Sequence, residues 1–257
     1  MFFYLNLNEL VGYSFTYGEV CFIKREALKM KKVTVFIGSP RKQATYQAAQ
    51  EFAANLKSYG EIDIEYVFLK DYHLEYCRGC KSCFVKGEEF CPLKDDRDIL
   101  LEKMNNSDGI IFATPNYSFQ VSALMKTFLD RLGFVLHRPR FFGKAFTAVG
   151  CCLTALEPMI PLEQKKISQE IKKASVRFYN ELTRQTLPAP SFFRLMVFRM
   201  SRTSIRLMLD EKSRDYRHYK EKGWFESDYY YDASLGIIKK LTGHFFEFLG
   251  KRMATQR

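Results

Sequence analysis

The sequence predicts an α/β protein built on a doubly wound parallel sheet. Three short runs of β-branched and other apolar residues, 33–37, 62–69 and 109–113, alternate with segments of helical character. Strands that alternate with helices are typical of parallel sheets. Because such sheets bind ligands at the carboxyl ends of their strands, the loops that follow these runs should gather at one edge. With 47% hydrophobic residues, the 257-residue chain can form an ordinary core.

The first strand, Val33–Ile37, leads directly into the polar segment Gly38–Thr45, and a helix is expected from there to about Leu56. A strand, a polar loop and a helix in this order present backbone N–H groups and a helix N-terminus to an anion. The hydroxyl and cationic side chains of the loop are those of Ser39, Arg41, Lys42 and Thr45. This segment is therefore a candidate phosphate-binding loop, although an ordinary strand-to-helix turn has the same outline.

A cluster of cysteines follows the second strand, residues 62–69. Four of the seven cysteines in the chain lie within fifteen residues, at Cys77, Cys80, Cys83 and Cys91. Four thiolates at this spacing can hold an iron–sulfur cluster within a single loop. A structural zinc site usually uses two separated C-x2-C pairs, so zinc fits this spacing less well, and free or redox-active thiols are a further alternative. A helix from the acidic residues at 95–98 to about Met104 should close this segment.

The third strand, Gly109–Ala113, leads into Thr-Pro-Asn-Tyr-Ser-Phe at 114–119 and a helix expected over Val121–Leu136. Lys126 and Asp130 are four residues apart and share a face of this helix. Phe146–Val149 is a candidate fourth strand, and a helical stretch from about Pro161 to Leu182 follows it. Four strands are evident in the sequence.

The last third of the chain is basic and aromatic. Residues 186–257 contain fourteen basic and eight acidic residues, so +6 of the chain's net charge of +11 lies in this region. After the linker-like Leu187–Pro190, a helix is expected over Ser191–Leu209, with Arg194, Arg199, Arg202 and Arg206 on one side. Such a helix can pack against its own domain or a second copy, or lie on an anionic membrane. Residues 215–232 are expected to form loop and cover, before a last helix over Leu235–Leu249.

Composition excludes several classes of protein. No nucleic-acid motif accompanies the positive charge, and neither a signal peptide nor a run of about 20 apolar residues is evident. Cysteines in such a chain indicate metal, redox or buried thiols, so we expect a cytoplasmic protein. Residues 1–29 carry no motif, and Met30 precedes a natural first strand, which suggests Met30 as the start residue. The expected division is an extension over 1–29, a core domain over 30–186 and a helical region over 187–257.

Three motifs together resemble a known family. They are Gly-Ser-Pro-Arg-Lys at 38–42, the cysteine run followed by Asp-Asp, and Thr-Pro-Asn-Tyr with Lys126, Asp130 and Arg131 downstream. In this order they resemble the flavodoxin-like NAD(P)H-dependent FMN reductases, and within them the iron–sulfur flavoproteins. The resemblance covers about residues 30–150. It implies a flavodoxin-like sheet that binds FMN and, in this branch, a 4Fe–4S cluster on the four cysteines.

The resemblance also implies roles for individual residues. Ser39, Arg41, Lys42 and Thr45 would hold the FMN phosphate. The residues that would line the isoalloxazine edge are Pro115, Asn116, Tyr117, Ser118 and Phe119. NAD(P)H would reduce the flavin, an unidentified acceptor would take the electrons, and no side chain is expected to act as a catalytic acid or base. Lys126, Asp130 and Arg131 would have structural and interface roles, and a homo-oligomer is expected.

Two departures from the family pattern bear on these expectations. The phosphate loop has Gln43 and Ala44 where Gly-Asn is common, and the fourth strand leads to Gly150–Thr154 without the family's second flavin loop. The sheet is therefore expected to be trimmed to four clear strands. An alternative from another class is a non-catalytic flavodoxin-like interaction protein with a degraded flavin pocket.

Overall fold

A parallel sheet forms the centre of the N-terminal part of the molecule. The computed structural model describes residues 30–152 and 161–255. In this part of the chain the parallel strands are β1 (Lys31–Ile37), β2 (Ile62–Phe68), β3 (Gly109–Tyr117) and β5 (Ala145–Cys152). They lie in the order β2-β1-β3-β5, with Lys31 opposite Ile62, Val33 opposite Gly109, and Gly109 opposite Ala145. This is the flavodoxin-like order of strands, with four parallel strands among the described residues.

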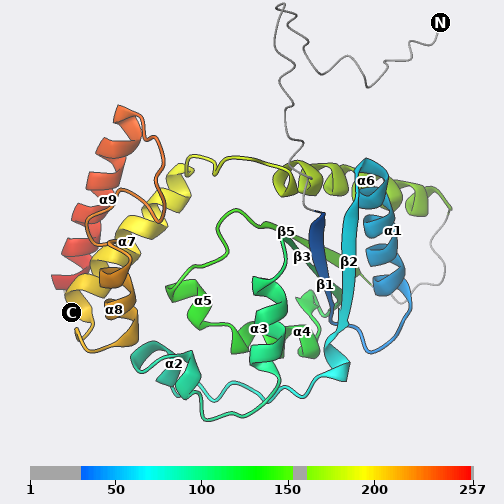
Figure 1. Cartoon of the computed structure of the whole chain (residues 1–257), viewed down its shortest axis with the longest axis horizontal. Helices are drawn as coiled ribbons and strands as arrows, with labels where there is room; N and C mark the ends of the chain where they lie inside the picture. The colour runs from blue at the N-terminus through cyan, green and yellow to red at the C-terminus, as the bar shows by residue number, and fades with distance from the viewer. Residues whose placement is uncertain (1–29, 153–160, 256–257) are drawn as a thin grey trace, which may run out of the picture.

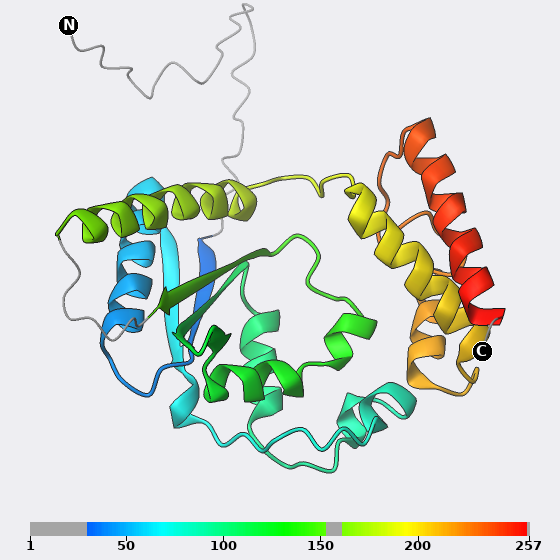
Figure 2. The ribbon, with the colours of Figure 1, turned by 180° about the vertical axis from the view of Figure 1, so that it is seen from behind.

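The sheet is covered by helices on both faces (Figures 1 and 2). On one face lie α1 (Ala44–Tyr59) and α6 (Pro161–Leu182), and on the other lie α3 (Arg97–Asn105) and α4 (Ala123–Arg131). Alternate residues of β1 point to the two faces, as the twofold repeat of a strand requires. Val33, Val35 and Ile37 pack with α1 and α6, and Phe36 packs with α3 and α4. The strand is buried on both faces, which explains its mainly apolar character, and the one buried hydroxyl, that of Thr34, bonds to Ser107 at 2.6 Å.

The predicted third helix is divided in two. The sequence predicts one helix over 121–136, but α4 ends at Arg131 and a short helix, α5, covers Phe134–His137. The backbone N–H groups of Leu132 and Gly133 bond to carbonyls three residues back, at Leu129 and Asp130. This tighter pattern is typical of a helix end. The break leaves both Arg131 and Arg138 buried, on either side of α5.

The C-terminal helices form a third hydrophobic cluster of their own. This region contains α7 (Phe192–Met208), α8 (Arg214–Glu221) and α9 (Ile237–Thr255). Its core is made mainly of aromatic side chains, namely Phe198, Tyr219, Trp224, Phe225 and Tyr229, together with Leu195, Ile205 and Leu235. No helix in the described residues is long and apolar enough to cross a membrane.

One helix in this region was not predicted. Residues 215–232 were expected to be loop and cover, yet α8 occupies the first part of this segment. Its N-terminus is capped by Ser213, whose hydroxyl accepts the N–H of Tyr216 at 3.3 Å. The high content of charged and aromatic residues hid the helix, because an eight-residue helix shows little periodicity.

The remaining short elements lie in the loops that follow β2 and β3. They are η2 (Leu69–Asp71), α2 (Ser82–Val85) and η3 (Glu88–Phe90), all between β2 and α3, and β4 (Gln120–Val121), which pairs antiparallel with the end of β3. Figure 1 shows α2 near α8, at the side of the sheet domain that faces the C-terminal helices.

Candidate functional site

The loops with the predicted site residues meet at the carboxyl edge of the sheet. Because β1, β2 and β3 are parallel, the segments that follow them, from Gly38, Leu69 and Ser118, leave the sheet on the same side. The backbone N–H of Gly38 donates to the carbonyl of Ala113 at 2.7 Å, which ties the first loop to the third. The predicted phosphate loop and the Pro-Asn-Tyr segment are therefore neighbours.

Gly38 is confined by the helix that follows the third strand. A Cβ atom at this position would lie 2.9 Å from the Cβ of Met125 and 3.0 Å from the hydroxyl of Ser122. No larger residue fits without movement of α4. The loop after Gly38 then turns at Ser39, whose hydroxyl accepts the N–H of Arg41 at 3.2 Å and donates to the carbonyl of Arg41 at 3.0 Å.

The N-terminus of α1 has the features of an anion site. Its N-cap residue, Gln43, makes no side-chain capping hydrogen bond, and the first turn contains no acidic residue. The first N–H groups of a helix have no partners within the helix and carry partial positive charge. Arg41 and Lys42 are exposed beside this turn, while Ser39 and Thr45 are buried. Backbone donors, hydroxyls and cations of this kind fit a phosphate group.

The Pro-Asn-Tyr segment ends in a tight hairpin. Pro115 is buried near the end of β3, and the chain reverses after Tyr117 to form β4. Both residues of the turn have left-handed backbones, with φ of 52° at Ser118 and 62° at Phe119. Glycine and asparagine are the usual residues for such a turn, and a bulky residue in this region is strained. Phe119 is nevertheless 92% exposed, so its ring is held at the surface beside the edge of the sheet.

Ser122 joins the two parts of this edge and was not singled out from the sequence. Its hydroxyl donates to the carbonyl of Gly38 at 2.6 Å and accepts the N–H of Met125 at 3.2 Å, as the N-cap of α4. Its own N–H donates to the hydroxyl of Thr114. A serine directly before a helical pattern is a recognisable cap signal, but its long-range bond to Gly38 could not be read from the sequence.

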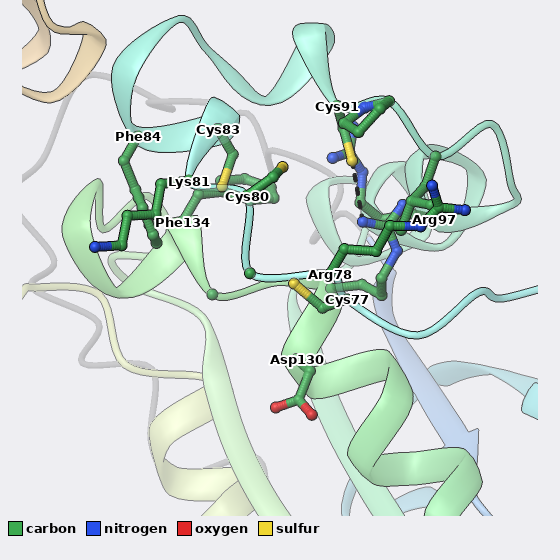
Figure 3. Close-up of a pocket in the computed structure, with 15 residues that line it drawn as sticks. Cys77, Arg78, Cys80, Lys81, Cys83, Phe84, Cys91, Arg97, Asp130 and Phe134 are labelled. Atoms are coloured by element: carbon green, nitrogen blue, oxygen red, sulfur yellow. Dashed lines mark hydrogen bonds between the residues drawn. The ribbon is translucent and has the colours of Figure 1, made fainter.

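The four cysteines lie around a single cavity of about 70 Å³. Its lining includes Cys77, Cys80, Cys83 and Cys91, together with Asp130, Arg131 and Phe134. Figure 3 shows the four labelled cysteines on different sides of this hollow. Left-handed backbones at Gly79 and Lys81 bend the loop around it. Within the described residues, no three histidine, cysteine, aspartate or glutamate side chains are arranged to hold a metal ion. The number and kind of donors fit an iron–sulfur cluster.

The cysteines have different electrostatic surroundings. The thiol of Cys80 is exposed, and its hydrogen bond to the hydroxyl of Ser82 lowers its pKa. Burial raises the pKa of the Cys83 thiol. The guanidinium of Arg131 lies 3.1 Å from the sulfur of Cys91 and also binds both carboxylate oxygens of Asp95, at 2.8 and 3.1 Å. Burial opposes ionisation of Asp95, but the hydrogen bond from Arg131 holds its pKa below the usual range.

A second buried arginine ties the cysteine loop to the C-terminal helices. Arg138 is fully buried and donates to the carbonyl of Cys83 at 2.9 Å and to the carboxylate of Glu88 at 2.7 Å. Its other nitrogen pairs with Asp215 of α8. Arg140 also binds Glu88, at 2.7 Å. Burial opposes the ionisation of Glu88, but these bonds lower its pKa to about 2. No sequence pattern indicates this network, because its members are far apart in the chain.

The helix α4 contributes an exposed ion pair to the same edge of the domain. Lys126 and Asp130 are one turn apart, and the ammonium of Lys126 lies 2.5 and 2.7 Å from the two carboxylate oxygens. Asp130 also lines the cysteine cavity. Exposed pairs of this kind contribute little to stability.

Comparison with known proteins agrees with this arrangement. The model of the family of NADPH-dependent FMN reductases matches residues 31–166, which is more than half of the chain. The chain belongs to this family. The match includes the sheet, the candidate phosphate loop, the cysteine loop and the Pro-Asn-Tyr hairpin, and it ends before the C-terminal helices.

Several relatives are iron–sulfur flavoproteins. One from Archaeoglobus fulgidus is 37% identical over 115 residues, which cover 45% of this chain and 51% of the relative. One from Methanocaldococcus jannaschii is 38% identical over 100 residues, covering 39% and 51%. One from Methanosarcina thermophila is 32% identical over 123 residues, covering 48% and 62%. The family member described here therefore spans about half the length of the curated relatives it matches.

Solved structures with a similar arrangement are more distant. A flavone reductase is 19% identical with a TM-score of 0.42, over 59% of this chain and 62% of the other. An azoreductase from Bacillus anthracis is 14% identical with a TM-score of 0.42, over 59% and 100%. Because these TM-scores are below 0.5, the functional assignment rests on the residues of the site.

Proposed function

We propose that this family member is an NAD(P)H-dependent FMN oxidoreductase or electron-transfer flavoprotein that binds FMN at the carboxyl edge of its sheet. The observation that carries the proposal is the edge itself. There Ser122, directly after the Tyr117–Gln120 hairpin, binds Gly38, the first residue of the loop that leads to the uncapped N-terminus of α1. A phosphate group and a flat ring system need these two features side by side. The family membership supports the same cofactor.

The predicted residues have distinct tasks in this proposal. Ser39, Arg41, Lys42 and Thr45 bind the phosphate of FMN through hydroxyl, cationic and helix N-terminal groups. The segment that lies along the isoalloxazine ring consists of Pro115, Asn116, Tyr117, Ser118 and Phe119. Bound FMN supplies hydride and single-electron chemistry. The protein residues bind and orient it, and no side chain of the chain is assigned as an acid or base.

We further propose that Cys77, Cys80, Cys83 and Cys91 hold a 4Fe–4S cluster. Four thiols around one cavity support this, as do the relatives named iron–sulfur flavoproteins. The guanidinium of Arg131 lies 3.1 Å from the sulfur of Cys91, so it can donate a hydrogen bond to a sulfur ligand of the cluster. Zinc or free thiols are the alternative outcomes of the test below.

The wider functional setting is proposed on the family resemblance. NAD(P)H is the reductant, the electron acceptor is unidentified, and the protein is a cytoplasmic homo-oligomer. No nucleic-acid partner is proposed.

Anaerobic purification tests the cofactors directly. We expect flavin absorption bands together with a broad brown shoulder, and bleaching of the flavin bands by NADH or NADPH. Cys91→Ser should lose iron while it keeps FMN. Zinc in place of iron would replace the cluster proposal. A colourless protein that cannot be reconstituted with FMN and iron would instead support a non-catalytic interaction protein.

A charge reversal tests the phosphate loop separately. The double variant Arg41→Glu, Lys42→Glu should weaken FMN binding by about tenfold or more, because it places two negative charges beside the phosphate. Lys57→Glu, an exposed lysine at the opposite end of the same helix, is the matched control. Equal losses of FMN affinity in the double variant and the control would rule out this location for the phosphate.

A further inference from the structure

The last helix, α9, carries its large apolar side chains on its outer surface. Figures 1 and 2 show α9 on the side of α7 that faces away from the sheet. The outer side chains that are each more than half exposed are Ile237, Ile238, Leu241, Phe245, Phe248 and Met253. We call this set the outer face of α9. A helix of a water-soluble protein usually turns such residues toward the core.

The inner face of α9 explains why these residues are not needed for packing within the chain. Gly243 and Gly250, seven residues apart, face α7. A Cβ atom on Gly243 would lie 3.2 Å from the Nε of Arg199, and one on Gly250 would lie 3.2 Å from the Cβ of Thr203. The two helices therefore approach closely through small residues. The bulky apolar residues remain on the opposite side, where the chain provides nothing to cover them among its described residues.

The charges of α9 are divided between its two faces. Its single acidic residue, Glu247, points inward and accepts a hydrogen bond from Arg202 at 2.6 Å. Lys240, Lys251 and Arg252 are exposed, and Lys251 also reaches Glu247 at 3.2 Å. The outer face of α9 is thus bordered by basic residues and by no acidic residue of this helix.

This arrangement differs from the expectation drawn from the sequence. The arginines of α7 were candidates for contact with an anionic surface, but Arg199 and Arg202 are buried and paired with Asp228 and Glu247. The exposed combination of apolar and basic side chains lies on α9 instead.

We propose that the outer face of α9 binds peripherally to an anionic lipid membrane. A bilayer interface offers an apolar layer for the isoleucine, leucine and phenylalanine side chains and negative headgroups for the lysines and arginine. Two copies of the chain are a poorer fit. An antiparallel pairing through this face would place Lys240 of one copy near Lys251 and Arg252 of the other, and like charges repel.

Vesicle co-sedimentation of the full chain tests the proposal. The probes are vesicles of phosphatidylcholine alone and vesicles of phosphatidylcholine with phosphatidylserine. We expect binding to the anionic vesicles that weakens as salt is added. The double variant Leu241→Ser, Phe245→Ser should reduce this binding by about tenfold or more, because it removes two large apolar groups from the face. Lys240→Glu should also reduce it.

Matched variants on α6 control for surface changes in general. Ile167→Ser with Val176→Ser removes two exposed apolar residues from the sheet domain, and Lys172→Glu reverses an exposed charge there. These variants should bind the anionic vesicles as the unchanged chain does. All six substitutions are at exposed positions, and circular dichroism with urea unfolding verifies that each variant is folded.

Four results would overturn the proposal. They are absence of binding to anionic vesicles, equal binding to neutral vesicles, equal losses in the α6 and α9 variants, and a dimer in sedimentation velocity that Phe245→Ser dissociates. The last result would mean that a second copy covers the outer face of α9.

Discussion

At the scale of single residues, the hydroxyl of Ser122 links two segments of the candidate flavin site, although Ser122 is not among the residues that the sequence predicts for it. It caps α4 and also binds the carbonyl of Gly38, which lies 84 residues earlier in the chain. Ser122→Ala removes the cap and leaves a buried carbonyl without its donor. We expect a loss of unfolding free energy of about 2 kcal/mol, measured by urea unfolding, and weaker FMN binding, measured by fluorescence titration.

A matched serine cap separates the two effects. Ser213 caps α8, is buried to a similar extent and lies in the C-terminal region. Ser213→Ala should reduce stability by about 1 kcal/mol and leave FMN affinity unchanged. If Ser122→Ala lost no more FMN affinity than Ser213→Ala, the role of Ser122 in the site would be purely structural.

Some residues of the candidate site can be predicted from the sequence, and others cannot. The Gly-Ser loop, the cysteine run and the Pro-Asn-Tyr segment are contiguous motifs, so they were visible before the structure. Ser122 and Arg138 act through partners that are distant in the chain, and no periodicity reports such contacts. The sequence places Arg199 and Arg202 on one side of α7, but it does not show whether that side is buried. Their pairing partners, Asp228 and Glu247, come from segments that pack on α7 only in the folded chain.

At the scale of elements, Glu88 stabilises the cysteine loop. Arg138 and Arg140 lower the pKa of this carboxylate from 4.5 to about 2. Since the folded-state pKa is below the unfolded value, the stabilisation is fully present above pH 4.5 and is lost as the pH falls toward 2. A shift of this size corresponds to about 3 kcal/mol at most. Glu88→Gln should therefore reduce stability at pH 6 and flatten its decline between pH 5 and pH 3 in urea unfolding.

Glu181 supplies the comparison for this pH dependence. It forms an exposed ion pair with Arg184 at the end of α6. Glu181→Gln should change the slope of unfolding free energy against pH very little, because exposed pairs contribute little. If unfolding free energy varied with pH as steeply in Glu88→Gln as in the unchanged chain, Glu88 would not stabilise the loop.

The hairpin between β3 and β4 is an element in which stability and binding should oppose each other. Phe119 is strained, with φ of 62°, and is 92% exposed, so its ring gains little from burial in the free protein. Phe119→Gly should raise the unfolding free energy of the FMN-free protein by about 1 kcal/mol and weaken FMN binding. Thermal unfolding and flavin titration measure the two effects. A less stable FMN-free variant would contradict the assignment of strain to this turn.

The helices and strands differ in how well sequence patterns predict them. The strands and α6 were predicted because buried apolar runs and long amphipathic patterns repeat enough to be recognised. The break between α4 and α5 was missed, since Leu132 and Gly133 interrupt no apolar pattern. It follows from backbone hydrogen bonds at the end of α4, which the sequence does not display.

At the scale of the whole molecule, the contact between Arg138 and Asp215 connects the family domain to helices that lie beyond the family match. Both side chains are buried, and Arg138 also holds the carbonyl of Cys83. Asp215→Asn removes one of the two carboxylates that pair with this arginine and leaves Glu88 as the other. We expect a loss of unfolding free energy of about 2 kcal/mol, because a buried hydrogen bond between charged groups is weakened while Glu88 still pairs with the arginine.

The same variant should loosen the cysteine loop in a residue-specific way. In metal-free protein, alkylation of Cys83 followed by mass spectrometry should become faster in Asp215→Asn, because Arg138 no longer fixes the backbone beside it. Alkylation of the exposed Cys80 should keep its rate and serves as an internal reference. Asp228→Asn, which breaks the more exposed pair with Arg199, should leave both rates unchanged. If Cys83 reacted equally fast in all three proteins, the C-terminal helices would pack beside the cysteine loop without controlling it.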